Sequence, residues 1–560
     1  MLKSRGRHIW LVLLLVLSLT VAIGMLGCAP AADTPEDPAE PTDPDDSDDT
    51  DAPEDPVGPE RVVVAHPQGV GSWDPPQCWL TAPEYLIENA YDYLLIKSAD
   101  GEEWVGELAT HWEQIDELTT RFYLRDDVEF HDGTPLTAED VKFHYRRIIE
   151  GTREEYILRG QYEWIDEMII HDDYTIDFVT QTPDALMLFK IAQQNNGAGI
   201  VSKDYFLEVG VEGVHRWPMG SGPWVLEEWV RDEHVLFSAN QNYWGGQPDF
   251  DELEFRIIPE GSTRVAELLT GGVDLIYDVI PQDKDRIDNN PTTRTEWQET
   301  GTGYFLSQRR GVNPEIPEGD PLHRYFTTED PRIRRAVEMA IDKYVLRDFV
   351  GGTGEAFRAR IFQPLPEGKP SLYGPEANIY DPDRARELIE EAGYEEGEAY
   401  LKFHAREDYP FGDLARVIED FLLQVGFDVD LELLDQTTFN QEVYFPIHSE
   451  ELMLNSLGGN MNPFFGTRQY HSDEERMQRY GRFDPEMSAE LDPLLLKAWD
   501  SRVPDEERYQ AFHDASQIMA DYNLTTGLFQ HSTLWGMSDR IEYTPRFDGD
   551  IWGMDIKKAQ

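Results

Sequence analysis

Cysteine is nearly absent from the 560-residue chain, which contains only Cys28 and Cys78. Two thiols cannot form a disulfide framework, and they give no basis for a structural zinc site. The fold must therefore depend on hydrophobic cores, for which 40% hydrophobic and 12% aromatic residues are sufficient. A chain of this length exceeds what one core supports, so several domains of roughly 150 residues are expected.

Basic residues are also scarce. The chain has 48 Lys and Arg residues against 109 Asp and Glu residues, and its formal net charge is −61. The resulting field repels phosphate backbones and anionic lipid head groups. We therefore expect no nucleic acid partner.

The motifs of common enzymes are missing. The sequence has no H-E-x-x-H, no G-x-S-x-G and no glycine-rich phosphate loop ending in Lys-Ser or Lys-Thr. Its fourteen histidines show no spacing typical of metal ligands. These absences predict a protein that is not an enzyme and that has no catalytic residues, no cofactor and no metal site. A secreted hydrolase with an acid pair hidden among the many carboxylates stays open as an alternative.

The N-terminus has the pattern of an export signal. Three basic residues within the first seven precede an almost unbroken apolar run, Ile9–Met25, which ends at Gly27-Cys28. The ending Met-Leu-Gly-Cys resembles a lipoprotein box, which implies that residues 1–28 are a signal peptide and that Cys28 receives a lipid. An uncleaved membrane anchor is the alternative. Both place the protein outside the cytoplasm, attached to the cell membrane and facing the periplasm or the exterior.

Residues 29–60 form an acidic linker. They include eight prolines and thirteen Asp or Glu residues, but no Lys or Arg and hardly any large apolar side chain. Such a segment cannot bury enough apolar surface to fold. We expect a disordered, extended stalk that holds the folded body away from the membrane.

Strand and helix patterns alternate from Arg61 onward. Arg61–Ala65 and Tyr174–Thr180 are typical of strands. Asp381–Gly393 has apolar residues at helical spacing and ends at a glycine suited to a C-terminal cap. Leu414–Val425 predicts another helix, and the alternating segment Phe427–Leu433 predicts the strand after it. This alternation favours layered α/β lobes.

One segment identifies a family. It spans Gly106–Gly151, with the sequence GELATHWEQIDELTTRFYLRDDVEFHDGTPLTAEDVKFHYRRIIEG. Asp132-Gly133 predicts a turn, and Thr137 with Asp140 predicts the cap of the following helix, so these residues receive structural roles. The segment resembles the signature of the family 5 solute-binding proteins of ABC importers, which include dipeptide-, oligopeptide- and nickel-binding receptors.

Further stretches also resemble this family, and they occur in the same order along the chain. They are GSGPWVLEEWV at 220–230, NQNYWGGQPDFDELEFRIIPEGSTRVAELLTGGVDL at 240–275, PRIRRAVEMAIDKYVL at 331–346 and YDPDRARELIEEAGY at 380–394. Within them, Gly220 and Gly222 predict a tight backbone turn, and Tyr243–Gly246 predicts packing and a turn rather than a sugar-binding platform.

The resemblance covers nearly all of the mature chain and implies a fold. We expect an α/β protein of the periplasmic-binding-protein type II class, cluster C-like, with two α/β lobes joined by hinge strands and an extra domain. The implied divisions are lobe I at 61–95, 205–310 and 525–560, the extra domain at 96–204 and lobe II at 311–524. Ligand would be buried as the lobes close.

The resemblance also implies candidates for ligand contacts. In related receptors the loop after the first Asp-Pro contributes to the cleft; here that loop is Trp73–Thr81, and Trp79 is the preferred residue because its ring can stack on a solute. Hinge strands are expected near Tyr304–Gln308 and Leu528–Trp535. Tyr304 and Trp535 are candidates for facing the cleft. Core packing is the alternative for all three aromatic residues.

A second ligand region is Leu452–Tyr470. Peptide-binding relatives carry a tryptophan there, then an aspartate that recognises the peptide α-ammonium, then Asp-Pro. With Asn462-Pro463 placed on that Asp-Pro, the aspartate position holds Gly459. Because an unpaired buried ammonium is costly, this favours an uncharged polar ligand, with Asn460 and Asn462 as its contacts. A one-residue gap would instead put Asn460 at the critical position.

These features predict a lipid-anchored extracytoplasmic receptor. It would act as a monomer, capture a small polar solute, either an oligosaccharide or a peptide, between its lobes and deliver it to an ABC permease. The alternatives are a secreted hydrolase and a receptor for a metal chelate of the nickel type.

Overall fold

The computed structural model describes residues 60–78, 84–98, 103–152, 156, 159–160, 162–192, 197–308, 327–358, 375–444, 452–457, 470–472, 485–546 and 548–560. The predictions for the export signal, for lipid attachment at Cys28 and for the acidic linker up to Pro59 fall outside these residues.

A ten-stranded sheet runs through the described chain. Its strands lie in the order β14 (Phe427–Leu434), β13 (Ala399–Arg406), β15 (Leu452–Leu457), β12 (Thr293–Gln308), β16 (Thr525–Ser538), β11 (Leu275–Ile276), β1 (Arg61–His66), β10 (Glu252–Ile257), β9 (His234–Ala239) and β8 (Trp224–Val230). β1 is parallel to both β10 and β11, and β13 is parallel to β14 and β15. The sheet is therefore mixed, with parallel strands in both halves.

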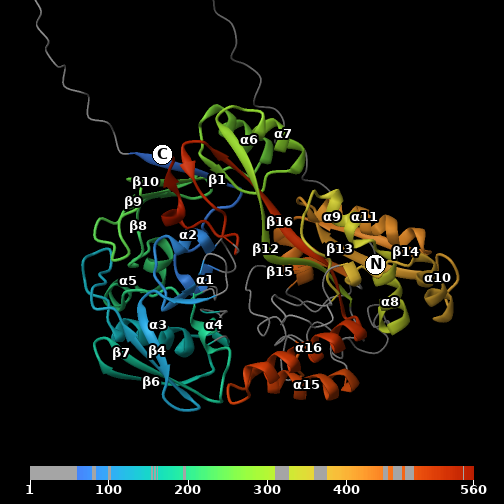
Figure 1. The fold of residues 1–560 in the computed structure, drawn as a ribbon, viewed down its shortest axis with the longest axis horizontal. Coiled ribbons are helices and arrows are strands. Elements are labelled where there is room, and N and C mark those ends of the chain that lie inside the picture. The colour runs from blue at the N-terminus through green and yellow to red at the C-terminus, as the bar shows by residue number, and fades with distance from the viewer. Residues whose placement is uncertain are drawn as a thin grey trace, which may run out of the picture. The chain divides into compact units, whose positions relative to one another are not determined.

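Two long antiparallel strands, β12 and β16, connect the two halves of this sheet (Figure 1). The first part of β12, Thr293–Glu299, pairs with the end of β16, and the part Gly303–Ser307 pairs with the beginning of β16. The part of β12 that pairs with β15 is the second part, and the part of β16 that pairs with β11 is its end. The two predicted hinge strands are therefore present, and both are longer than the sequence pattern indicated.

Each half of the sheet has its own hydrophobic core, and we call the halves the first and the second lobe. Phe255 and Trp535 belong to the first core, whereas Tyr304, Leu306 and Leu528 belong to the second. The chain thus passes from one core to the other inside β12 and β16. This change does not coincide with residues 310 and 525, where the sequence resemblance places the limits of lobe I.

Short helices cover the first lobe. They are α1 (Pro75–Cys78), α2 (Glu84–Glu88), α5 (Lys203–Arg216), α6 (Gly261–Thr270), the 3-10 turn η2 (Pro281–Asp283), α7 (Lys284–Asp288) and the 3-10 turn η6 (Gly553–Asp555). Leu268 of α6 and Ile287 of α7 pack with Leu534 of β16 in a further cluster. A small ribbon, β17 (Ile541–Glu542) with β18 (Lys557–Lys558), completes this part of the chain.

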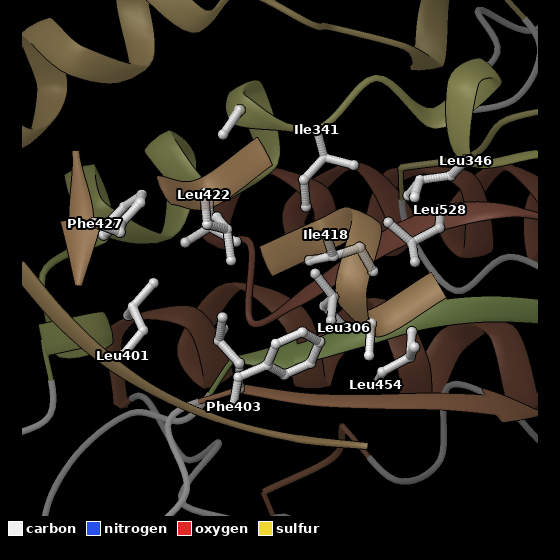
Figure 2. Close-up of a cluster of buried hydrophobic side chains, with 14 of the residues drawn as sticks. Leu306, Ile341, Leu346, Leu401, Phe403, Ile418, Leu422, Phe427, Leu454 and Leu528 are labelled. Atoms are coloured by element: carbon white, nitrogen blue, oxygen red, sulfur yellow. The ribbon is translucent and has the colours of Figure 1, made fainter. Parts of the chain in front are cut away.

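The second lobe is built around amphipathic helices that pack on β12 and β13. Its elements are η3 (Thr327–Glu329), α8 (Pro331–Ala340), α9 (Lys343–Phe349), η4 (Pro375–Ala377), α10 (Pro382–Glu391), α11 (Phe411–Gln424), α12 (Gln436–Phe439) and the π-helical η5 (Asn440–Tyr444). Figure 2 shows Ile418 of α11 beside Leu306 of β12. The predicted helix at 381–393 is confirmed as α10, with Asp381 accepting a hydrogen bond from the Arg384 backbone nitrogen at 2.9 Å.

The segment expected to be an extra domain has a separate sheet and a separate core. Its four strands lie in the order β4 (Ala109–Gln114), β5 (Thr119–Leu124), β7 (Thr175–Thr180) and β6 (Ile165–Asp172), beside the ribbon of β2 (Leu95–Lys97) and β3 (Trp104–Gly106). The helices are α3 (Ala138–Glu150) and α4 (Met187–Ile191). Phe122, Tyr145 and Phe178 form the centre of this core.

The signature segment has the structural roles predicted for it. Gly133 lies in the left-handed region at φ 82°. The Thr137 backbone nitrogen donates to Asp140 Oδ2 at 3.0 Å, which closes the start of α3. Asp140 Oδ1 also accepts from the Lys203 backbone nitrogen at 3.0 Å, so the cap fastens α3 to the start of α5.

A helical pair, α15 (Pro485–Trp499) and α16 (Asp505–Tyr522), contacts the segment that precedes α4. Leu186 lies in one cluster with the buried faces of α15 and α16. The Ala185 backbone nitrogen donates to the Trp499 carbonyl oxygen at 2.9 Å. The helical pair thus joins two segments that are far apart in the sequence.

Buried Asp92 organises the region around the GSGPW and YWGG stretches. Its carboxylate accepts hydrogen bonds from Ser221 Oγ at 2.8 Å, from Tyr243 Oη at 3.0 Å and from Trp244 Nε1 at 3.1 Å. Gly246 follows with φ 97°. The YWGG stretch therefore has the packing and turn role that the sequence predicted.

Close backbone contact explains Gly220 and Gly222, rather than a left-handed turn. A Cβ atom added at Gly222 would lie 2.6 Å from the carbonyl carbon of Ala90 and 2.7 Å from the nitrogen of Tyr91. At Gly220 it would lie 2.0 Å from the Ala90 oxygen. Neither glycine is among the described residues with positive φ. Main-chain atoms cannot move aside easily, so both positions require glycine.

Gly222→Ala is therefore expected to lower the free energy of unfolding by about 1–3 kcal/mol, the usual cost of overpacking. Gly160→Ala is the matched control, because a Cβ atom there meets no atom within 4 Å. Its effect should stay within about 0.5 kcal/mol. Urea unfolding followed by tryptophan fluorescence compares the two, and equal losses would contradict the explanation by close contact.

Candidate functional site

A pocket lies where β12 and β16 pass between the lobes. It encloses about 310 Å³ of non-atom space, part of which is open to solvent. We call it the hinge pocket, and it is lined by Asp278, Val279, Pro281, Trp297, Tyr304, Val350, Gly352, Tyr409, Pro410, Phe529, His531, Ser532 and Leu534. Both lobes contribute to it, because Val279 and Leu534 pack in a first-lobe cluster and Tyr304 and Phe529 pack in the second core.

Local structure explains why these side chains meet. Asp278 comes two residues after β11, at the carboxyl end of a strand that is parallel to β1. Ligands of α/β sheets bind outside such strand ends. Tyr304 lies in β12 between Gly303 and Phe305, where the pairing with β16 is irregular. Such a bulge bends a strand and redirects its side chains.

Aromatic rings surround the buried end of the pocket. The Tyr304 ring lies 5.5 Å from the ring of Phe411, 5.2 Å from that of Phe529 and 5.2 Å from that of His531. The Tyr409 hydroxyl donates to the Val350 carbonyl oxygen at 3.2 Å. These contacts fix the rings in place, so the pocket is preformed.

The ionisable groups of the pocket differ in charge. Burial raises the pKa of the Asp278 carboxyl to about 6, with Asp408 adding to the effect and Arg264 and Arg406 opposing it. Burial lowers the pKa of the His531 imidazole to about 4, so this ring is neutral at pH 7. Burial and the nearby Asp278 raise the pKa of Tyr304 and of Tyr409. At neutral pH the described lining residues therefore have one formal charge, which is the negative charge of Asp278.

The two predicted contact residues that the structure describes, Tyr304 and Trp535, lie in different surroundings. Tyr304 lines the hinge pocket, with 2% of its surface exposed. Trp535 is fully buried in the first core, 5.0 Å from the Tyr277 ring, and is not among the described residues that line the pocket. Trp79, Asn460 and Asn462 lie outside the described residues. A ligand-binding role for each of these residues stays a prediction.

Among the pocket residues that were not singled out from the sequence, three are titratable: Asp278, Tyr409 and His531. A signal for Asp278 was available, because it follows the short buried strand at the end of the GGVDL stretch. Tyr409 carries no such signal, whereas His531 lies in the expected hinge strand Leu528–Trp535. Their place depends on how the start of α11 approaches β16, which is a property of the packed fold.

Two further features of the described residues concern metal binding and membrane spanning. In the part of the chain that the structure describes, no three His, Cys, Asp or Glu residues are grouped so that they could hold a metal ion. Among the described helices, none combines the length and the apolar character needed to cross a membrane.

Comparison with protein families decides what this scaffold is. Residues 103–479, more than half of the chain, match the family described as bacterial extracellular solute-binding proteins, family 5 Middle. The chain belongs to this family. The recognition made from the signature segment is thus confirmed. The family is one of binding proteins rather than of enzymes.

Two curated proteins of Escherichia coli (strain K12) are similar to this family 5 protein. The nickel-binding periplasmic protein is 26% identical over 345 residues, which are 60% of this chain and 62% of that protein. The dipeptide-binding protein is 27% identical over 351 residues, which are 58% of this chain and 61% of that protein. The chain thus spans about three fifths of the length of these relatives.

A solved structure supports the fold over a larger share of the chain. The crystal structure of a dipeptide binding protein from Pseudoalteromonas sp. SM9913, in complex with Met-Leu, has a TM-score of 0.73 at 22% identity. It covers 89% of this chain and 100% of that one. The α/β periplasmic-binding-protein fold predicted from the sequence is confirmed.

Proposed function

We propose that this family 5 protein is the solute receptor of an ABC importer, attached to the membrane by a lipid on Cys28. It captures a small polar solute, a peptide or an oligosaccharide, between its two lobes and delivers it unchanged to a permease. The observation that carries the proposal is the hinge pocket, which lies where the paired strands β12 and β16 pass between the lobes and is lined from both lobes.

The arrangement of β12 and β16 supports a closing motion. Both strands continue from one lobe into the other at this point, and their pairing is irregular around Gly303. A Cβ atom at Gly303 would lie 2.7 Å from the Phe357 ring, and one at Gly527 would lie 2.8 Å from the Phe357 oxygen. Glycine at both positions lets the strands pass Phe357 closely. Hinge closure typically uses a few positions of this kind.

Contacts away from the hinge fit the same mechanism. Gln68, just after β1, donates through Nε2 to Oε1 of Gln436 at the start of α12, at 2.9 Å. This exposed hydrogen bond joins the first lobe to the second. Because exposed contacts contribute little free energy, it can form and break as the lobes close and open.

The solute class is supported by the relatives. Of the three relatives described above, two are named for binding dipeptides and one is named for binding nickel. A peptide offers amides that pair with neutral polar groups and side chains that stack on aromatic rings. We therefore place peptides first and oligosaccharides second.

Thermal unfolding with a panel of solutes tests this function. A solute at 100 times its Kd stabilises the native protein by about 2.7 kcal/mol, which raises the Tm by several degrees. The panel contains short peptides, oligosaccharides and nickel with histidine. Small-angle scattering should show a smaller radius of gyration with the active solute. The intact mass of protein from the membrane fraction reports the lipid on Cys28.

Three results would count against the proposal. They are a panel without any shift in Tm, a shift without a change in the scattering profile, and chemical conversion of the bound solute. The last result would favour the secreted hydrolase instead.

A further inference from the structure

We propose that Asp278 makes the hinge pocket selective for a solute with a cationic ammonium group, which binds between the Asp278 carboxylate and the surrounding aromatic rings. This inference rests on the proposed function, because it assumes that the hinge pocket is where the solute binds. It names the chemical group that the pocket recognises and the residue that recognises it.

The described residues provide no counter-ion for the carboxylate of Asp278. Within the part of the chain that the structure describes, it has no ion pair and no side-chain hydrogen bond, whereas Asp74, Asp92 and Asp274 all accept hydrogen bonds from side chains. A half-buried carboxylate without such partners is costly. A bound cation would remove that cost.

Two arginines lie near Asp278 but are engaged elsewhere. Arg264 donates through Nη1 to the Ile258 and Pro259 carbonyl oxygens, both at 2.9 Å, and through Nη2 to the backbone oxygen of Asp278 at 3.3 Å. Arg406 donates to Asp408 at 2.9 Å and lies 3.9 Å from the centre of the Phe411 ring. Neither guanidinium forms an ion pair with the Asp278 carboxylate.

The backbone of Asp278 is held in an unusual conformation. Its φ of 57° is in the left-handed region, which few residues other than glycine adopt. The hydrogen bond from Arg264 to its carbonyl oxygen fixes this conformation. Strained backbone maintained by neighbouring groups is typical of binding sites. Here it keeps the carboxylate at the pocket wall.

The rings of the pocket complete a site for a cation. Trp297, Tyr304, Tyr409 and Phe529 line the pocket together with the imidazole of His531. Aromatic faces attract ammonium groups, and the attraction increases where water is excluded. The rings are neutral at pH 7, since burial lowers the pKa of His531 to about 4 and raises those of the tyrosines. An anionic group would meet only repulsion from Asp278.

The size of the pocket limits what enters it. The pocket is small, because its about 310 Å³ of non-atom space includes open solvent and the enclosed part is less than a whole solute needs. We expect it to accept the ammonium end of a solute, with the remainder of the solute extending toward the opening. The segment Leu452–Tyr470 by itself favours an uncharged ligand, but Asp278 supplies a negative charge from another segment.

Two matched probe pairs test the inference on the full chain. One pair is choline and its uncharged carbon analogue 3,3-dimethylbutan-1-ol; the other is alanyl-alanine amide, which is a cation, and its uncharged N-acetylated form. Affinities come from isothermal titration at pH 7.5 and constant ionic strength. We expect at least one cationic probe to bind at least about tenfold more tightly than its uncharged partner.

The variant Asp278→Asn should abolish this preference, because asparagine keeps the size and the left-handed backbone but removes the charge. Asp232→Asn is the matched control, since Asp232 also has a left-handed backbone, with φ 61°, but is exposed in the turn after β8. The control should keep the preference of the unchanged protein. Circular dichroism confirms that both variants are folded.

The possible results distinguish a failure of this inference from a failure of the proposed function. If a solute of the broad panel shifts the Tm and closes the lobes but neither cationic probe is preferred over its partner, the inference fails and the receptor function stands. A preference that survives in Asp278→Asn also overturns the inference. If neither the probes nor the panel bind, both proposals fail.

Discussion

Replacing Arg147 by alanine should lower the free energy of unfolding by about 3–5 kcal/mol, because it leaves the buried carboxylate of Asp74 without its counter-ion. Arg147 Nη2 donates to Asp74 Oδ1 at 2.7 Å, and Nη1 donates to Asp74 Oδ2 at 3.1 Å. The two side chains are only 4% and 0% exposed. Arg147 also donates to the Tyr156 hydroxyl at 3.2 Å. A lower urea midpoint, followed by tryptophan fluorescence, measures the loss.

The preceding residue provides the control. Arg146 lies on the same helix, α3, but its ion pair with Glu150 is at the surface, where the side chains are 48% and 60% exposed. Exposed pairs of this kind contribute little, so Arg146→Ala should change stability by no more than about 0.5 kcal/mol. Comparable losses in both variants would mean that the buried pair is not the cause.

The Arg147 pair also bears on the ligand loop expected from the sequence. Asp74 belongs to the loop Trp73–Thr81, which contains the candidate Trp79. The Tyr91 hydroxyl donates to the Trp73 carbonyl oxygen at 3.1 Å, and the Asp74 nitrogen donates to Ser72 Oγ at 3.1 Å. Helix α3 therefore anchors the start of this loop through one buried ion pair. Asp74 has a structural role at this point.

Local chemistry accounts for what the sequence predicted correctly. The Asp381 cap, the Thr137 and Asp140 cap and the Gly133 turn each depend on residues within a few positions of one another. Their identities determine the local hydrogen bonds whatever the rest of the chain does. The hinge strands were found through the family resemblance, and their full length follows from pairing partners more than 200 residues apart, which no local pattern contains.

Arg147 shows where local reasoning is insufficient. Its position in the last turn of α3 is favourable for the helix dipole, and Arg146 directly precedes it on the same helix. Only tertiary packing makes one of the two arginines a buried counter-ion of Asp74. The candidate site follows the same rule. Tyr304 was identified because it lies in a hinge strand, whereas Asp278 becomes a candidate because it lines the pocket and no described residue forms an ion pair with it.

Asp278→Asn should stabilise the protein at pH 7.5, by about 1–3 kcal/mol. Burial raises the pKa of this carboxyl from its ordinary 3.8 to about 6 in the folded protein. Between these two values the folded state binds more protons than the unfolded state, so stability falls as the pH rises from about 4 to about 6. Above pH 6 the full cost of the charged carboxylate is present, and asparagine removes it.

Unfolding measurements at two pH values test whether Asp278→Asn raises the stability as predicted. Urea midpoints of the unchanged protein and of Asp278→Asn should differ at pH 7.5 and converge near pH 4, where the carboxyl is protonated in most folded molecules. Asp232→Asn, at an exposed position with the same backbone conformation, should follow the unchanged protein at both pH values within about 0.5 kcal/mol. If Asp278→Asn were less stable at pH 7.5, the carboxylate would already have a favourable partner. A bound cation would then remove no free-energy cost of burying the charge. A gain in stability together with a loss of cation preference would instead show that the chain keeps an unfavourable charge at its hinge because the solute requires it.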